Sequence, residues 1–266
     1  MVDSLVSWQQ QERVAWLTLN QPERRNPLSS ATLAALSQSL DKAFLEDSIR
    51  VVVITALGPV FSAGHDLAEM TRRDSETESD WRGRIQHILA SCAEMMMKIV
   101  HGPKPVIACV QGMATAAGCQ LVSACDLAIA DTQAQFCTPG VNLGAFCTTP
   151  LVGIGRNVSR KHALEMALTG NRFSAEDAVR FGLINRHVPS DQLLGETTEL
   201  ATLIASKSRD SIRRGKSAFY QQVDMPLAEA FTLANQVMLD ALTTDDDAAR
   251  GVEGFLSKQP VDWSSP

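Results

Sequence analysis

Short, continuously apolar runs, separated by stretches in which apolar residues recur at helical spacing, constrain the fold of this chain more than any other feature. Four such runs are predicted to be strands, at residues 13–19, 50–55, 105–110 and 126–130. Strands that are apolar along their whole length are typical of parallel sheets covered by helices, whereas a sheet with one solvated face alternates polar and apolar residues. The front part of the chain is therefore predicted to be an α/β structure.

After about residue 158 the strand signals nearly stop, and one helical pattern follows another. The expected helices span residues 160–169, 174–181, 191–206, 209–222, 226–241 and 245–257. Gly170 and Gly182 stand where two of these helices end, and Pro226 stands in the first turn of another, as these residue types commonly do. We expect two regions, 1–190 and 191–266, of which the second is all helical and packs on the first or on a partner subunit.

Charge and apolar content exclude several classes of protein. The 30 acidic residues against 24 basic ones give a net charge of -6, whereas a general nucleic-acid binder is normally basic. No run approaches the roughly 18 apolar residues that cross a bilayer, and the first residues show no signal or transit peptide pattern. We expect a cytoplasmic protein that binds neither nucleic acid nor membrane, and whose six cysteines are buried, reduced thiols.

Two loop-to-helix junctions give the strongest indication of a site. The sequence FSAGHDL at residues 61–67 follows the run that ends near Thr55, and GMATAAGCQ at 112–120 follows the run that ends near Val110. Small residues let a backbone come close to a ligand, and the first N–H groups of a helix have no partner within it. If the two helix starts converge, these N–H groups would stabilise a developing oxyanion. Close packing of a helix against a strand is the alternative interpretation.

At these residues the chain resembles the crotonase (enoyl-CoA hydratase/isomerase) superfamily. The resemblance runs in order along nearly the whole chain, through residues 20–28 (NQPERRNPL), 61–67, 112–121, 134–136, 142–144, 175–178, 182–183 and Phe255 with Lys258. Within the superfamily, the combination of GHDL, ATAAGCQL, TPGVN and LGAFCTTP is most similar to the enoyl-CoA hydratase domain-containing protein 3 group.

The resemblance implies a spiral of ββα units with a C-terminal helical trimerisation region, and assembly as trimers or dimers of trimers. It also implies an acyl-CoA thioester as the ligand, with no metal and no cofactor other than the CoA of the substrate. By position, the two oxyanion-hole N–H donors of the family fall on His65 and Ala117. The residues that the resemblance places at the substrate and CoA are Arg24, Arg25, Ala63, His65, Asp66, Leu67, Ala117, Gly118, Phe255 and Lys258.

The chain departs from the family at two catalytic positions. Hydratases of the family use two glutamates, whose positions here hold Gln120 and Gly140. An amide can orient a water but cannot take its proton, and general acid–base groups contribute about 10²- to 10⁴-fold each. Efficient hydration is therefore not expected unless another residue substitutes. His65 is the first candidate because an ordinary imidazole titrates near neutrality, and the alternative is that its ring only binds nearby backbone.

Three functions remain open. The first is an enzyme that holds a thioester enolate in a backbone oxyanion hole, formally a hydratase or isomerase. The second is a decarboxylase or isomerase, because FSAGHDL and TPGVNLG also resemble methylmalonyl-CoA decarboxylase and loss of CO₂ needs no glutamate base. The third is a non-catalytic acyl-CoA-binding scaffold. Asp66 is expected to cap a helix, and Cys147 to pack beside the pocket.

Overall fold

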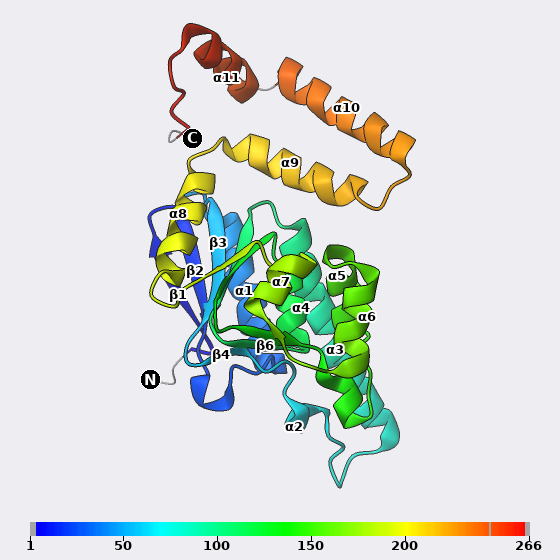
Figure 1. Ribbon diagram of the computed structural model, residues 1–266. Coiled ribbons are helices and arrows are strands. Elements are labelled where there is room, and N and C mark those ends of the chain that lie inside the picture. The colour runs from blue at the N-terminus through cyan, green and yellow to red at the C-terminus, as the bar shows by residue number, and fades with distance from the viewer. Residues whose placement is uncertain (1–3, 245, 264–266) are drawn as a thin grey trace.

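The computed structural model describes residues 4–244 and 246–263, and they form two sheets flanked by helices (Figure 1). The larger, six-stranded sheet has the order β1-β2-β3-β5-β7-β10, and only β1 runs antiparallel to its neighbour. Its strands are β1 (Val6–Gln11), β2 (Val14–Leu19), β3 (Val51–Ala56), β5 (Val106–Val110), β7 (Leu127–Asp131) and β10 (Arg186–Val188). The strands of the second sheet, in order across it, are β4 (Val60–Ser62), β6 (Met113–Thr115), β8 (Gln135–Cys137) and β9 (Phe173–Ser174).

Helices follow the strands along the chain. In the first part they are η1 (Pro22–Arg24), α1 (Ser30–Leu45), α2 (Leu67–Met70), α3 (Glu78–His101), α4 (Ala117–Ala124), η2 (Pro139–Leu143), α5 (Pro150–Asn157), α6 (Arg160–Thr169) and α7 (Ala175–Phe181). The later ones are α8 (Leu193–Ala205), α9 (Arg209–Gln222), α10 (Leu227–Thr244) and α11 (Asp246–Ser257). The Ser29 hydroxyl caps α1 by accepting a hydrogen bond from the Thr32 N–H at 3.2 Å.

The chain follows a spiral, and each of its turns contributes one strand to the larger sheet and one strand to the second sheet. β3 leads into β4, β5 into β6 and β7 into β8, and helices follow each pair. The alternation of buried residues along β3 explains why this strand is apolar throughout. Val52 and Ile54 face the core shared with α1 and α3, whereas Val51 and Val53 face a second core closed by α8. The predicted α/β spiral of ββα units is thus the observed fold.

The second sheet was not foreseen from the sequence. The first loop-to-helix junction, at residues 61–67, begins inside β4, and the small-residue stretch after Val110 contains β6. These strands are only three residues long, so they have no periodicity to detect. The expectation that strands nearly stop after residue 158 was also incomplete, because β10 extends the larger sheet.

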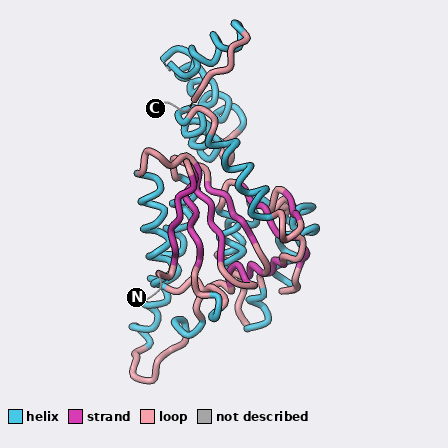
Figure 2. The backbone as a smooth tube through the Cα atoms, turned by 90° about the vertical axis from the view of Figure 1, so that its left-hand side faces the viewer, coloured by secondary structure: helices cyan, strands magenta, loops and turns pink. Residues whose placement is uncertain are grey.

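The C-terminal helices differ in how far they lie from the larger sheet. Helix α8 packs on the larger sheet through Leu193, Ala201 and Ala205. By contrast, α9, α10 and α11 extend beyond the sheet, as both views show (Figures 1 and 2). No helix in the described ranges is both long and apolar enough to cross a bilayer. The boundary predicted between residues 190 and 191 stays a prediction.

Candidate functional site

The two junctions singled out in the sequence lie side by side, because β4 and β6 are neighbouring parallel strands. Gly64 has a φ of +83°, and a Cβ built on it would lie 3.1 Å from the backbone nitrogen of Ala117. A Cβ on Gly118 would lie 2.6 Å from the carbonyl oxygen of Ser62. Glycine at these two positions therefore lets the two junctions touch through their backbones.

The backbone at the second junction is strained. Ala116, directly before α4, has a φ of +50° and a ψ of -118°, an arrangement that an L-residue rarely adopts. Two hydrogen bonds hold Ala116 in this conformation. The Ala116 N–H donates to the carbonyl oxygen of Cys137 at 2.9 Å, and the Ala116 carbonyl accepts from the Gln120 N–H at 3.0 Å. Ala117 is the first residue of α4, so its N–H has no partner within the helix.

His65, at the first junction, is half-buried and has one uncommitted ring nitrogen. Its Nδ1 lies 3.4 Å from the carbonyl oxygen of Leu28, whereas its Nε2 has no hydrogen-bond partner in the described part of the chain. Burial lowers the pKa of the ring, and the Leu28 carbonyl and the Glu69 carboxylate oppose this only in part. The imidazole is therefore neutral at pH 7. The backbone contact expected as the alternative role of this side chain is present, and it leaves Nε2 available.

One unpartnered polar atom follows each of three neighbouring strands, within five residues of the end of the strand. His65 Nε2 follows β4, Gln120 Oε1 follows β6 and Thr138 Oγ1 follows β8. Gln120 is 7% exposed and Thr138 is fully buried. Buried polar atoms are nearly always hydrogen-bonded, so unpartnered ones at adjacent strand ends indicate where a bound molecule or ordered water belongs. Thr138 was not identified from the sequence, although a polar residue directly after a buried strand was a signal for it.

Gly140, the second substituted position, has no room for a side chain. A Cβ there would lie 2.9 Å from Cys147 Sγ and 3.0 Å from Cys147 N. The Gly140 N–H donates to the same sulfur at 3.3 Å. Burial raises the pKa of the Cys147 thiol, so the thiol stays protonated at neutral pH. Cys147 therefore fills the space into which a side chain at position 140 would point.

The arginine-containing segment at residues 20–28 is bound to the first junction. Arg24 Nη2 donates to Asp66 Oδ2 at 2.6 Å, and the Ala63 N–H donates to the carbonyl of Arg25 at 2.9 Å. Asp66 caps α2 as predicted, since its Oδ1 accepts from the Ala68 N–H at 3.1 Å. The buried Asn26 binds the carbonyls of Leu57 and Val60 through Nδ2, a positioning role that was not foreseen.

The structure does not bring all the expected CoA contacts together in one chain. Arg24, Arg25, Ala63, Asp66 and Leu67 lie around the first junction, near α2. Phe255, which is 84% exposed, lies on α11, and Lys258 follows that helix. Figure 1 shows α11 at the end of the molecule opposite to α2.

Comparison with known proteins gives a consistent result. Residues 9–266 match the family model described as enoyl-CoA hydratase/isomerase. The chain is 47% identical to enoyl-CoA hydratase domain-containing protein 3 of Rattus norvegicus, over 98% of this chain and 84% of that protein. It is 33% identical to 2,3-dehydroadipyl-CoA hydratase of Escherichia coli, over 95% of this chain and 96% of that protein. A crystal structure of the human domain-containing protein 3 is 41% identical with a TM-score of 0.91, covering 97% of this chain and 99% of the other.

These relatives contradict the expected cellular location. The rat, mouse and human proteins are all named mitochondrial, so the cytoplasmic location predicted from the sequence is wrong on this comparison. That prediction depended on the residues that open the chain, yet β1 begins as early as Val6. The stretch Val6–Gln11 belongs to the folded domain, and the composition of a folded domain does not report its compartment.

Proposed function

Because the chain belongs to the enoyl-CoA hydratase/isomerase family, also called the crotonase superfamily, we propose that it is an enzyme acting on an acyl-CoA thioester. The backbone N–H groups of His65 and Ala117 hold the thioester oxygen and stabilise the enolate that forms when charge develops on it. Donors of this kind contribute about 10²- to 10³-fold each. Arg24 and Arg25 are exposed beside the same junction, where their charges suit the phosphates of CoA.

One observation carries this proposal, namely the close approach of Gly64 to the backbone nitrogen of Ala117. The start of α4 adds its own positive potential, since the N-terminus of a helix favours negative charge. The strained Ala116 supports the same interpretation, because strained backbone persists where the surroundings fix it and often marks a functional site.

A cinnamoyl-CoA chromophore tests the oxyanion hole, because its absorption moves to longer wavelength when the thioester carbonyl is polarised. We expect a red shift with the wild-type protein. We expect its loss in Gly64→Ala, where the new Cβ forces the two junctions apart. Gly155→Ala is the matched control, since a Cβ at Gly155 meets nothing within 4 Å. A full red shift in the Gly64 variant would overturn the assignment of these N–H groups.

A second candidate, decarboxylation, is favoured over hydration by Gln120 and Gly140. Neither position offers a carboxylate, and Cys147 leaves position 140 no space for one. When a carboxylated acyl-CoA loses CO₂, the carbon–carbon bond breaks and its electron pair enters the enolate directly. No base has to remove a proton, and a proton from water completes the new C–H bond.

Parallel assays separate these activities. We expect CO₂ release from malonyl-CoA or methylmalonyl-CoA, and little hydration of crotonyl-CoA. Rapid hydration would show that another group replaces the missing glutamates, and would contradict the argument drawn from Gln120 and Gly140. Tight CoA binding without turnover of any enoyl-, hydroxyacyl- or dicarboxylyl-CoA would contradict an enzymatic function and support a non-catalytic acyl-CoA-binding scaffold.

We further propose that the protein assembles as a trimer or a dimer of trimers. Proteins of the family are typically oligomeric. Within one chain α11, which carries Phe255, lies at the opposite end of the molecule from α2, whose capping residue Asp66 binds Arg24 (Figure 1). A second copy that places its α11 near residues 20–28 would complete the CoA site. The experiment for this assembly is given with the whole molecule in the Discussion.

A further inference from the structure

The four-residue helix α2 begins two residues after His65, so whatever holds α2 also holds the backbone of the first junction. A helix of one turn is not stable by itself, because forming the first turn fixes several residues for very few hydrogen bonds. The position of α2 must therefore be fixed by contacts with other parts of the chain.

Glu69, the third residue of α2, binds the start of α1 through two hydrogen bonds. Its Oε2 accepts from the N–H and from the hydroxyl of Ser30, both at 2.8 Å. Ser30 is the first residue of α1, so its N–H has no partner within that helix. The carboxylate satisfies this donor, and its charge is favoured there because the N-terminus of a helix carries a positive potential.

The segment at the start of α1 also holds the other side of His65. Leu28 is fully buried, and its N–H donates to the carbonyl of Gly64 at 2.7 Å. Residues 28–30 therefore fix the chain directly before His65 through Gly64, and four residues after it through Glu69.

Two further contacts hold α2, and neither duplicates the contact with α1. Arg24 pairs with Asp66 at 2.6 Å, but the Arg24 side chain is 51% exposed, and exposed ion pairs contribute little to stability. Trp81 Nε1 donates to the carbonyl of Met70 at 2.9 Å, at the last residue of α2. The carboxylate of Glu69 joins α2 to the same segment that fixes the first junction.

We propose that Glu69 is a positioning residue, which holds α2 against α1 and thereby aims the backbone N–H of His65 at the thioester oxygen. This inference rests on the proposed oxyanion hole. The hydrogen bonds to Ser30 fix the orientation of α2, and the N–H must lie within hydrogen-bond distance of the developing oxyanion to stabilise it. A displacement of about 1 Å in such a group can lower the rate about 10²-fold.

The red shift of bound cinnamoyl-CoA, measured at saturation, reports the polarisation of the carbonyl rather than the affinity. We expect Glu69→Ala to lose most of this shift. Glu69→Gln should keep more of it, because an amide oxygen still accepts both hydrogen bonds. A merely structural carboxylate would change the melting temperature but not the red shift of the folded protein, and equal loss in the two variants would contradict the role of the hydrogen bonds.

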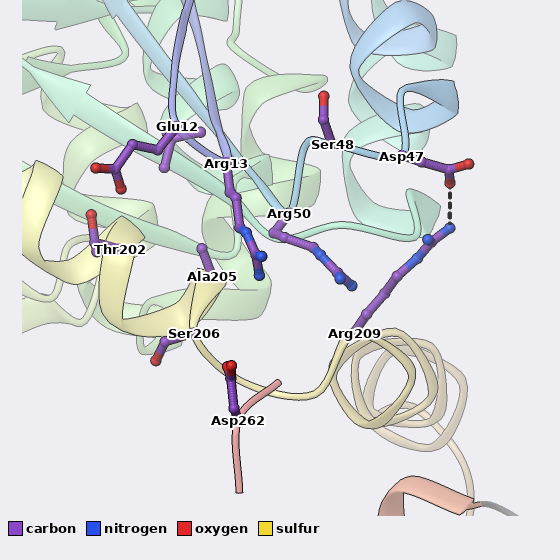
Figure 3. A pocket seen from close by; sticks show the side chains of 11 residues that line it. Glu12, Arg13, Asp47, Ser48, Arg50, Thr202, Ala205, Ser206, Arg209 and Asp262 are labelled. Carbon is purple, nitrogen blue, oxygen red and sulfur yellow. Dashed lines mark hydrogen bonds and ion pairs between the residues drawn. The ribbon is translucent and has the colours of Figure 1, made fainter. Parts of the chain in front are cut away.

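Asp47→Ala is the matched control. It removes a carboxylate just beyond the other end of α1, where Asp47 pairs with Arg209 at 2.9 Å in the lining of a hollow (Figure 3). We expect this variant to keep the full red shift. A loss as large as that in Glu69→Ala would show that any carboxylate near α1 has the same effect, and would overturn the assignment.

Ser30→Pro tests the same contact from the side of α1. It removes both donors, and proline is tolerated at the first position of a helix. The preceding residue, Ser29, has an extended backbone with a ψ of 164°, which suits a residue before proline. We expect Ser30→Pro to lose as much of the red shift as Glu69→Ala does, and the double variant to lose no more. A full red shift in Ser30→Pro would contradict the proposal.

Amide hydrogen exchange without ligand separates this inference from the proposed function. We expect residues 64–71 to exchange faster in Glu69→Ala, whereas the buried strand β5 should exchange as in the wild type. A wild type without a red shift would contradict the oxyanion hole, and faster exchange in Glu69→Ala would still support the contact that holds α2. A wild-type red shift that Glu69→Ala keeps in full would overturn this inference alone.

Discussion

The position of Cys147 determines which residue can stand at position 140. The Cys147 sulfur accepts the Gly140 N–H, and together with the backbone of residue 147 it fills the space next to the glycine. A larger residue at position 140 would have to move both. This contact explains physically why a glutamate cannot be placed there while Cys147 keeps its position.

Substitution of the glycine tests this contact. Gly140→Ala should lower the free energy of unfolding by about 1–3 kcal/mol, the usual cost of forcing extra atoms into a packed site. Denaturant unfolding measures it, with Gly155→Ala as the control that should cost nothing or add up to about 1 kcal/mol. Adding Cys147→Ala to Gly140→Ala should recover part of the loss. A loss equal to that of Gly140→Ala alone would show that the sulfur is not the obstacle.

The half-buried His65 makes stability depend on pH in a direction fixed by its lowered pKa. Between its folded pKa and its ordinary value near 6.5, the unfolded chain binds the proton more readily than the folded chain, so acidification favours unfolding. We expect the free energy of unfolding of the wild type to fall relative to His65→Asn as the pH drops from about 7.5 to 5. Unfolding in denaturant at several pH values measures the difference. Parallel curves would show that the ring titrates equally in both states.

At the scale of elements, one buried network fastens α9 to the core. Lys216 Nζ donates to Asp126 Oδ2 at 2.7 Å and to the carbonyls of Ile99 and Lys104, and the Tyr220 hydroxyl donates to Asp126 Oδ1 at 2.9 Å. The side chains of Lys216 and Asp126 are only 7% and 14% exposed. The Asp126 carboxylate also accepts from the N–H of Val106, so the first residue of β5 joins the same network.

Lys216→Met should therefore destabilise the protein by about 3–5 kcal/mol, because it leaves the Asp126 charge buried without its partner. Chemical denaturation measures the loss, and Arg213→Met on the exposed face of α9 should change the stability by less than about 0.5 kcal/mol. Adding Asp126→Asn should cost less than the sum of the two single changes. An additive double variant would show that the ion pair itself contributes little.

The sequence predicted the long elements well because they carry their own periodicity. The apolar runs became β2, β3, β5 and β7, and the helices from α6 onward begin and end within a few residues of the expected positions. The three-residue strands β4, β6 and β8 could not be found in this way. Their structure depends on pairing with each other across the fold, which is a tertiary effect and leaves no local pattern.

The parts of the candidate site that could be predicted from the sequence are those built from backbone atoms, and the packing of side chains could not be predicted. The two junctions lie against each other, with Gly64 next to Ala117, whereas the approach to a ligand that their small residues indicated stays a prediction. The roles assigned to His65 and Ala117 remain predictions. The space that Cys147 takes beside Gly140 arises from a turn that brings residues 140 and 147 together. No spacing rule in the sequence specifies that turn.

At the scale of the whole molecule, the helices beyond α8 expose apolar side chains that a lone chain would leave in water. Along α10 they fall at helical spacing on one face, at Leu227, Phe231, Met238 and Leu242. Exposed apolar stripes of this kind mark interaction surfaces. This face supports the proposed association of identical copies.

Light scattering checks the assembly. We expect a particle of at least three chains of 28.8 kDa, and we expect Phe231→Glu combined with Met238→Glu to shift it toward one chain. Leu168→Glu is the matched control, since Leu168 is 63% exposed and lies on α6, outside these helices. A wild-type protein that remains a single chain at working concentration would contradict the assembly, and with it the shared CoA site.

The order of strands in the larger sheet has a consequence for synthesis of the chain. From β2 to β7, each new strand joins the edge that the preceding one has just formed. A nascent chain can therefore extend the sheet as it leaves the ribosome. β10 must wait until residues 132–185 have been made, and closing so long a loop costs entropy that only later contacts offset. Until then the free edge of β7 is exposed, and so is the apolar face of the larger sheet that α8 later covers. During this interval the chain is most prone to aggregate and most in need of a chaperone.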